Sequence, residues 1–330
     1  MSNGQPTDNG TRCVLCPRRC LLAGKDSAGF CKTRVGGAGG GLPFYGRISS
    51  MAVDPIEKKP LFHYRPGEDI LSIGFVGCNM DCPFCQNWQI SRTTAAANGF
   101  VPPEKIAEKA LELGLKQIAY TYSEPLVHAE YVMDCMAAAR SLGIAGALVT
   151  NGCFNEEAAA EIIPLADAAN IDLKCFSEYN YRNTLKGSLP AVKNFIRAAF
   201  GKIHTEITTL IVPGFNDSEQ ETDACIDFIA SVSSGIPWHI TAYHPAYKWT
   251  AAPAKAETIL RIKERAEKKL LYCYTGNIND NNNSTFCVEC GAELVTRDGY
   301  NIKIRGLVKN GKSDNTYRCK RCGAATAVKY

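Results

Sequence analysis

The sequence contains few of the features that would direct it into a membrane or out of the cell. No apolar run approaches the roughly 20 residues that a membrane-spanning helix needs. The first residues, MSNGQPTDNGTR, are polar and lack the apolar core of a secretory signal. We therefore expect a cytoplasmic protein with no membrane partner.

A strong excess of charge of either sign is also lacking, since the net charge is only +4 over 330 residues. The excess gathers in residues 287–330, which hold nine Lys/Arg against four Asp/Glu. Four cysteine thiolates on one divalent metal ion would cut that excess. Nucleic-acid binding needs a strongly basic surface, so a nucleic-acid partner is disfavoured.

Cysteine, by contrast, is abundant, with 16 in the chain. Thiols stay reduced in the cytoplasm, so their spacing indicates metal binding before disulfides. Three groups stand out: Cys13, Cys16, Cys20 and Cys31; Cys78, Cys82 and Cys85; and Cys287, Cys290, Cys319 and Cys322. We expect the other five to be small buried apolar side chains: Cys135, Cys153, Cys175, Cys225 and Cys273.

From residue 70 onward, apolar strand-like runs alternate with helical patterns, which is typical of β-α-β units and a mainly parallel sheet. Periodicity allows a doubly wound sheet or an incomplete barrel. In both, ligands gather at the carboxyl ends of the strands. The predicted strands are 70–77, 117–122, 145–150, 169–174, 206–212 and 238–243, and the predicted helices are 103–114, 129–143, 155–166, 218–232 and about 254–270.

The middle cysteine group has the spacing C-x3-C-x2-C directly after the first predicted strand. Three thiolates from one tight loop suit three irons of a [4Fe-4S] cluster and leave the fourth iron open. Phe84 would shield one side of that cluster. The alternative is a zinc site that a distant residue completes.

The other two groups supply four thiolates each. Paired C-x2-C knuckles at Cys287/Cys290 and Cys319/Cys322 indicate a structural tetrahedral zinc site, with a rubredoxin-like iron site as the alternative. The first group, C-x2-C-x3-C-x10-C, would hold zinc or an auxiliary iron–sulfur cluster, and its spacing slightly favours zinc.

Polar residues follow the predicted strands where a site would form. They are Glu124 in TYSEP, Asn151 in TNG, Asp172 and Lys174 in DLK, and His244 in AYHP. Strand alternation puts Asp172 and Lys174 on one face. Residues 54–67, DPIEKKPLFHYRPG, form either a solvated loop over the barrel or a mouth lined by Lys58, Lys59 or His63.

Together these motifs resemble a known family. C-x3-C-x-aromatic-C after the first strand resembles the radical S-adenosylmethionine (SAM) superfamily. A longer ordered set of motifs resembles the AmmeMemoRadiSam system family, a branch similar to pyruvate formate-lyase activating enzymes. The motifs are CVLCPRRC, DPIEKKPLFHYRPG, GCNMDCPFCQNWQIS, TYSEP, VTNG, DLK, VPGFND, WHITAYHP and the terminal ribbon. In activating enzymes an aspartate stands where this chain has Val149, so their cation site is not implied here.

The resemblance implies an α/β fold with a partial (β/α)6 barrel at 47–275, a Cys-rich metal-binding segment at 1–46 and a zinc ribbon at 276–330. It implies that the open iron binds SAM, and that one-electron reduction yields a 5′-deoxyadenosyl radical that takes hydrogen from a substrate. Glu124 would receive the SAM amino group, Asp172 the ribose, and Lys174 and His244 the carboxylate, with Asn151 also in the cofactor-binding set.

We therefore expect a radical SAM enzyme that uses an electron donor such as flavodoxin or ferredoxin. Its substrate is unidentified, with a protein or peptide as one class, and AMMECR-type and Memo-type proteins would share its pathway. The alternatives are a glycyl-radical enzyme activase, a peptide-modifying radical SAM enzyme, and a non-catalytic metal or nucleic-acid binding module.

Overall fold

The computed structural model describes residues 4–7, 9–24, 27–36, 41–279, 283–311 and 316–330. The predicted GGAGGG tether at 36–41 lies mostly outside the described residues, as does the centre of the predicted Asn-rich linker at 276–286. Among the described residues, no helix has the length and apolar character that a membrane crossing requires.

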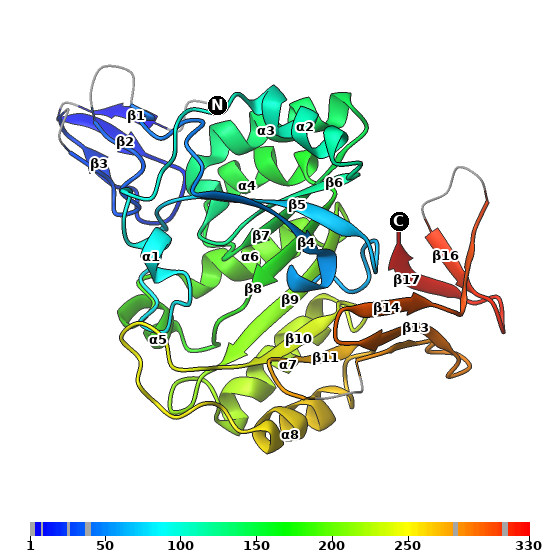
Figure 1. Cartoon of the computed structure of the whole chain (residues 1–330). Coiled ribbons are helices and arrows are strands. Elements are labelled where there is room, and N and C mark those ends of the chain that lie inside the picture. Colours follow the sequence, from blue (N-terminus) through cyan, green and yellow to red (C-terminus); the bar gives the residue numbers. More distant parts are fainter. Residues whose placement is uncertain (1–3, 8, 25–26, 37–40, 280–282, 312–315) are drawn as a thin grey trace.

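A single sheet of eight strands forms the centre of the molecule (Figure 1). Its strands follow chain order from one edge to the other, and all neighbours are parallel except the first pair, β4 and β5. The strands are β4 Ser50–Pro55, β5 Asp69–Gly74, β6 Gln117–Thr121, β7 Ala145–Thr150, β8 Ala168–Asp172, β9 His204–Ile211, β10 Trp238–Ala242 and β11 Cys273–Gly276.

The predicted parallel sheet is confirmed, and each of the six predicted strands has a counterpart in β5 to β10. Two strands carry too weak a local pattern to be predicted: β11 is only four residues long, and β4 contains Asp and Pro, which are poor strand formers. A doubly wound sheet needs a reversal of strand order. This sheet has none, so the doubly wound alternative is excluded.

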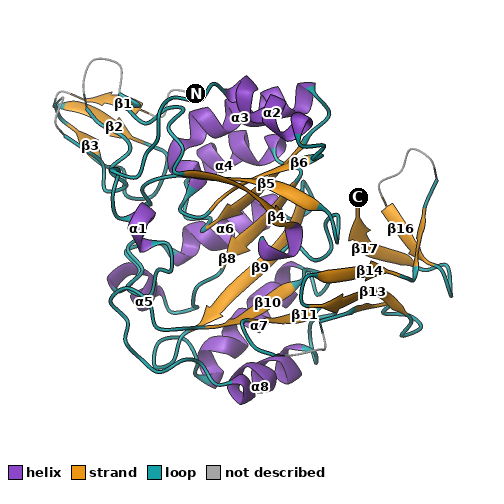
Figure 2. Ribbon diagram, in the orientation of Figure 1, coloured by secondary structure: helices purple, strands orange, loops and turns teal. Residues whose placement is uncertain are grey.

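Helices connect the parallel strands (Figure 2). Serines at the amino ends of α5, α6 and α7 accept hydrogen bonds from the backbone N–H groups of their first turns, as good N-caps do. The helices are α1 Trp88–Ser91, α2 Pro103–Glu112, α3 Ala129–Ser141, α4 Glu156–Ile162, α5 Glu178–Asn183, α6 Leu189–Ala199, α7 Glu219–Val232 and α8 Ala256–Ala266, with 3-10 turns η1 Ile56–Lys58, η2 Pro125–His128 and η3 Ile163–Leu165.

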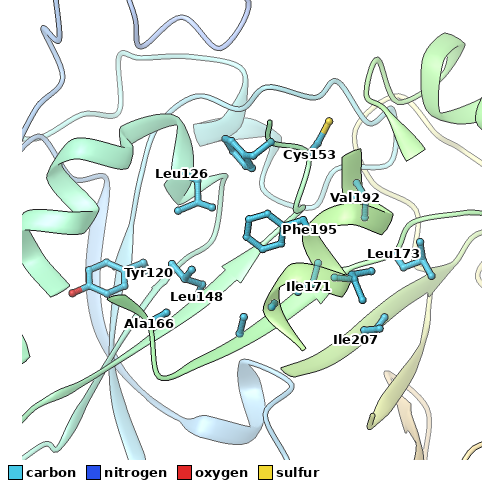
Figure 3. Close-up of a cluster of buried hydrophobic side chains, with 14 of the residues drawn as sticks. Tyr120, Leu126, Leu148, Cys153, Ala166, Ile171, Leu173, Val192, Phe195 and Ile207 are labelled. Carbon is cyan, nitrogen blue, oxygen red and sulfur yellow. The ribbon is translucent and has the colours of Figure 1, made fainter. Parts of the chain in front are cut away.

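Alternate strand residues build the main core against the helices. Leu148 and Ile171 lie in one apolar cluster with Val192 and Phe195 of α6 (Figure 3). The five scattered cysteines are all buried, as predicted. Burying such side chains supplies the principal stabilisation of the sheet and so makes the strand ends a rigid platform.

The opposite face of the sheet is lined by small side chains, such as Ala119 and Ala147, that pack against Ile56 and Leu61. Glu206 of β9 accepts hydrogen bonds from the backbone N–H groups of Phe62 and His63, at 3.0 and 2.7 Å. The segment after β4 therefore fills this side of the sheet near the amino ends of the strands.

This placement corrects the alternative that His63 lines the mouth. His63 is fully buried beside Glu206, near the amino end of β9, whereas ligands bind at the carboxyl ends. Lys59 is also buried and pairs with Asp54 at 2.7 Å. Lys59 and His63 therefore hold the fold. Lys58 is exposed and pairs with the same Asp54 carboxylate at 2.7 Å. Most of the segment is buried, so it is not a solvated loop.

Two small β-structures flank the central sheet on opposite sides (Figure 1). On one side lies an antiparallel sheet of β1 Gly4–Thr7, β2 Gly10–Cys13 and β3 Leu21–Leu22. On the other side lie two three-stranded sheets: β12 Thr285–Phe286, β13 Glu293–Asp298 and β14 Asn301–Ile304; and β15 Leu307–Lys309, β16 Thr316–Cys319 and β17 Ala325–Lys329. The first cysteine group and the ribbon cysteines therefore belong to opposite flanks.

Candidate functional site

The middle cysteine group lies in the loop that follows β5, which we call the triad loop (residues 77–87). The loop starts at Gly77, whose φ of 77° is a conformation that side chains rarely adopt. Cys78, Cys82 and Cys85 are all partly buried. The sharp turn at Gly77 thus directs three thiols to the carboxyl end of the sheet.

Arg92, at the carboxyl end of α1, holds the triad loop in shape. Its guanidinium donates to the carbonyl oxygens of Cys78 at 3.2 Å and Met80 at 2.6 Å, and pairs with Asp81 at 3.2 Å. A planar guanidinium with several fixed donors is suited to bridging successive backbone carbonyls. Arg92 therefore fixes the backbone between Cys78 and Asp81 in one conformation.

The thiols of the triad fit an iron–sulfur cluster by their environment. Burial raises the pKa of Cys78, and raises the pKa of Cys82 to about 12, so both are protonated at neutral pH until a metal displaces the proton. The backbone N–H of Met80 lies 3.4 Å from the Cys78 sulfur, and the Ser91 hydroxyl 3.3 Å from the Cys85 sulfur. Such donors stabilise metal-bound thiolates.

Phe84 is buried between the last two cysteines of the triad. Its ring packs against Phe215 and Trp249, with centroids 5.2 and 6.1 Å away. These partners belong to the loops after β9 and β10. Shielding of a cluster by Phe84 stays a prediction, but the ring fastens the triad loop to neighbouring strand ends.

His128 supports the strand that leads into the triad loop. Its Nε2–H donates to the carbonyl oxygen of Val76 at 2.8 Å, two residues before Cys78. Burial lowers the pKa of His128 to about 4. The imidazole is therefore neutral in the folded protein at neutral pH.

The His128→Gln substitution should reduce the acid sensitivity of stability. Because the folded pKa lies below the unfolded value of 6.5, the unfolded state binds more protons, and stability falls as pH falls through 6.5 toward 4. We expect the wild type to lose about 1 kcal/mol more than His128→Gln between pH 7.5 and 5.5. Urea unfolding at both pH values measures this, and equal losses would contradict it.

Glu124 follows β6 and lies at the centre of a buried hydrogen-bond network. Its carboxyl oxygens accept from the Thr150 hydroxyl at 2.7 Å, the Asn151 N–H at 2.8 Å and the Leu126 N–H at 3.1 Å. Burial raises the pKa of Glu124 to about 7, and these hydrogen bonds offset burial only in part. A cationic ligand would therefore find a carboxyl group ready to ionise.

The network reaches the triad loop through two asparagines. The Asn151 amide donates to the Asn79 side-chain oxygen at 2.8 Å and lies 3.7 Å from the Cys78 sulfur. Asn79 in turn donates to the Cys153 carbonyl at 2.8 Å. Glu124, Asn151 and Cys78 thus belong to one continuous assembly at the ends of β5, β6 and β7.

Asp172 and Lys174 lie at the end of β8 and face the triad from another side. Their side chains form an ion pair of 2.8 Å, with 32% and 20% of each exposed, so they share a face as alternation predicted. Burial would lower the pKa of Lys174, but Asp172 and Cys82 beside it outweigh burial and raise the pKa. His244 follows β10 and is exposed.

Sequence reasoning missed three residues of this site: Asn79, Arg92 and Thr150. Asn79 lies inside the cysteine motif, but an Asn there carries no spacing signal of its own. Arg92 is seven residues beyond Cys85, and its role depends on how the loop folds back. Thr150 directly precedes Asn151 in VTNG, so of the three it is the one that the sequence motif could most readily have indicated.

The ribbon cysteines form a compact metal-binding set. The ligand atoms of Cys287, Cys290, Cys319 and Cys322 all lie within 4.8 Å of one another. Two pairs, Cys287/Cys322 and Cys290/Cys319, have sulfur–sulfur distances of 3.7 Å. About 3.8 Å is expected around one tetrahedral ion with metal–sulfur bonds of 2.3 Å, so this group could bind a metal ion.

Comparisons with known proteins agree with this geometry. Residues 72–226 match the model of the Radical SAM superfamily. The uncharacterized protein MJ0808 of Methanocaldococcus jannaschii is 36% identical over 325 residues, which cover 96% of this chain and 95% of that protein. The pyruvate formate-lyase 1-activating enzyme of Escherichia coli K12 is 23% identical over 208 residues, or 57% of this chain and 85% of that enzyme.

Among solved structures, Streptococcus suis SuiB bound to its precursor peptide SuiA is similar, with a TM-score of 0.51 and 14% identity. The match covers 62% of this chain and 48% of that one, so it bears on the fold alone. The family match spans β5 to α7, which includes the triad loop, Glu124, Asp172 and Lys174. The chain belongs to the radical SAM superfamily.

Proposed function

We propose that this protein cleaves SAM reductively at a [4Fe-4S] cluster held by Cys78, Cys82 and Cys85, and that the resulting 5′-deoxyadenosyl radical takes a hydrogen atom from a substrate. The observation that carries the proposal is the meeting of three thiols with an acidic and a basic group at the carboxyl ends of β5, β6 and β8 in one parallel sheet. When bound, the cluster supplies the electron that breaks the sulfonium bond of SAM.

The chain's own residues would bind and orient SAM. Glu124, with its raised pKa, would ionise to pair with the SAM ammonium. Asp172 would accept hydrogen bonds from the ribose hydroxyls, and the cationic Lys174 would pair with the SAM carboxylate. His244, exposed after β10, would contact the same carboxylate, and Asn151 would keep Glu124 and Cys78 in register.

The proposal also covers the family, the barrel, the cellular location and the partners of this protein. The ordered motifs support membership of the AmmeMemoRadiSam system family and a partial (β/α)6 barrel, whose six strand–helix units would run from β5 to α8, with β11 after them. We propose a cytoplasmic location, a flavodoxin or ferredoxin as electron donor, and a pathway shared with AMMECR-type and Memo-type proteins. The compact sulfur set supports structural zinc in the ribbon.

Product analysis of SAM tests the proposal. Protein reconstituted with iron and sulfide, reduced with dithionite and kept anaerobic is incubated with SAM, and nucleosides are identified by mass spectrometry. We expect 5′-deoxyadenosine from the wild type and none from the Cys78→Ala/Cys82→Ala/Cys85→Ala variant. Cys225→Ala, which removes a buried cysteine of α7 outside the triad motif, is the matched control and should remain active.

Two outcomes would count against the proposal. Methylthioadenosine in place of 5′-deoxyadenosine would move the cleavage to the other side of the sulfonium. If the wild type binds iron and SAM but forms the same products as the triple variant, the triad is not a SAM-cleaving site.

A further inference from the structure

The first cysteine group builds a second site, outside the function proposed above. Cys13, Cys16, Cys20 and Cys31 all line one small, mostly enclosed cavity, together with Arg34 and Asn79. The four come from the end of β2 and from the turns that follow it. A shared cavity lined by four thiols is a metal-binding arrangement that the fold brings together from 19 residues of chain.

The spacing of these sulfurs differs from that in the ribbon. Around one tetrahedral zinc ion, four sulfurs stand about 3.8 Å apart, as the ribbon sulfurs do at 3.7 Å. Within the described ranges, no three sulfurs of the first group lie mutually within the 4.8 Å that encloses the ribbon set. A [4Fe-4S] cluster binds each thiolate to a different iron and so spreads the sulfurs around a larger group.

The cavity also offers hydrogen-bond donors to a bound cluster. Arg34 is 5% exposed, and its Nε is buried without a hydrogen-bond partner among the described residues, while its terminal nitrogens are held by Glu130. The Thr33 hydroxyl lies 3.2 Å from the Cys31 sulfur, and the Phe30 N–H 3.5 Å from the Cys20 sulfur. Donors of this kind surround cluster sulfurs in proteins, and an unpaired buried Arg34 Nε indicates an acceptor yet to be bound.

The cavity lies directly against the triad loop. A β-carbon on Gly77 would lie 2.3 Å from the carbonyl oxygen of Cys31, so only glycine allows this contact. The Arg18 Nε donates to the carbonyl oxygen of Asn79 at 2.9 Å, and Asn79 lines the cavity. The ribbon lies on the opposite flank of the sheet (Figure 1). The first group is thus the neighbour of the triad, and the ribbon is remote from it.

We propose that Cys13, Cys16, Cys20 and Cys31 bind an auxiliary [4Fe-4S] cluster beside the triad loop, and not a structural zinc ion. Sequence spacing slightly favoured zinc for this group. The open arrangement of the sulfurs, the unpaired Arg34 Nε and the contact with the triad loop favour the cluster instead.

The metal and sulfide content of a variant that lacks the three triad cysteines tests this inference. The full-length Cys78→Ala/Cys82→Ala/Cys85→Ala variant is reconstituted anaerobically with iron and sulfide in the presence of zinc, and freed of unbound metal. We expect about four irons and four sulfides per chain, with about one zinc from the ribbon. After reduction with dithionite, its spin-one-half EPR signal should not respond to SAM.

The reciprocal variant completes the test. Cys31→Ser should lose about half of the roughly eight irons of the wild type and keep the EPR signal that responds to SAM. If Cys31→Ser fails to fold by circular dichroism, the wild-type iron count alone decides between roughly four and eight irons per chain.

The inference would be overturned if the Cys78→Ala/Cys82→Ala/Cys85→Ala variant bound no iron and about two zinc ions per chain. That result would leave the proposed function intact, since the wild type would still cleave SAM. Conversely, about four irons in the triad-free variant together with no SAM cleavage by the wild type would sink the proposed function alone.

Discussion

Replacing Glu124 with glutamine is expected to weaken SAM binding about 30-fold while the protein stays folded. A hydrogen bond to a charged group contributes roughly 2 kcal/mol, which corresponds to that change in Kd. Glutamine keeps a side-chain oxygen for the Thr150 hydroxyl, but its amide cannot accept from the Asn151 N–H, so a modest loss of stability accompanies the loss of charge.

Glu124 would supply a charge to SAM and also accept hydrogen bonds that support its own loop. Equilibrium binding of SAM to the reconstituted protein from pH 6 to pH 8 separates these two roles. Because burial raises its pKa to about 7, the carboxyl group must lose a proton below that pH before it can pair with an ammonium. Affinity of the wild type should therefore rise with pH up to about 7 and then level off. In Glu124→Gln this contribution to the pH dependence should disappear.

Thr150→Val is the matched control for Glu124. It removes one donor to the carboxylate and leaves the charge, so SAM affinity should change less than about threefold. Equal loss of affinity in Thr150→Val and Glu124→Gln would show that Glu124 only supports the loop and does not receive the SAM ammonium.

Replacing Glu206 with leucine should lower the free energy of unfolding by about 4 kcal/mol. Glu206 is fully buried in β9, and its oxygens accept from His204 at 2.8 Å and His239 at 2.7 Å. Backbone N–H groups of Phe62 and His63 complete the set. Burial alone would raise the pKa of Glu206, but the two histidines outweigh it and hold the pKa well below its ordinary value.

The cost of the leucine comes from four donors that lose their acceptor in the interior. Glu206→Gln, which keeps one oxygen, should lose about half as much stability. Glu219→Gln is the control, since that side chain is 83% exposed and should change stability by less than about 0.5 kcal/mol. Urea unfolding measures all three, and a loss below about 1 kcal/mol in Glu206→Leu would contradict the assigned role.

Glu206 also explains why the sequence alone does not predict the placement of the segment at 54–67. Its charge and aromatic residues favour a surface loop or a binding mouth when they are considered alone. The acceptor that draws the segment into the sheet, Glu206, is more than 140 residues away in the chain. The segment is held further by the ribbon, because the backbone of Lys329 bonds to both His63 and Arg65.

Local pattern was sufficient for the parallel sheet and for two of the cysteine groups. Strand alternation and helix periodicity depend on residues a few positions apart, so β5 to β10 could be predicted within a few residues. The C-x2-C knuckles of the ribbon are tight turns, so their spacing already predicts that the four sulfurs come together, as their 3.7 Å distances show.

Contacts between distant loops were decided only by the tertiary structure. The sequence placed Glu124, Asn151, Asp172 and Lys174 at strand ends, but it could not show that Asn79 and Asn151 join Glu124 to Cys78. Nor could the spacing of the first group show how far apart its sulfurs lie, because that distance depends on how the chain folds around them. A motif determines which ligands are available, and the packing of distant segments determines how far apart those ligands lie.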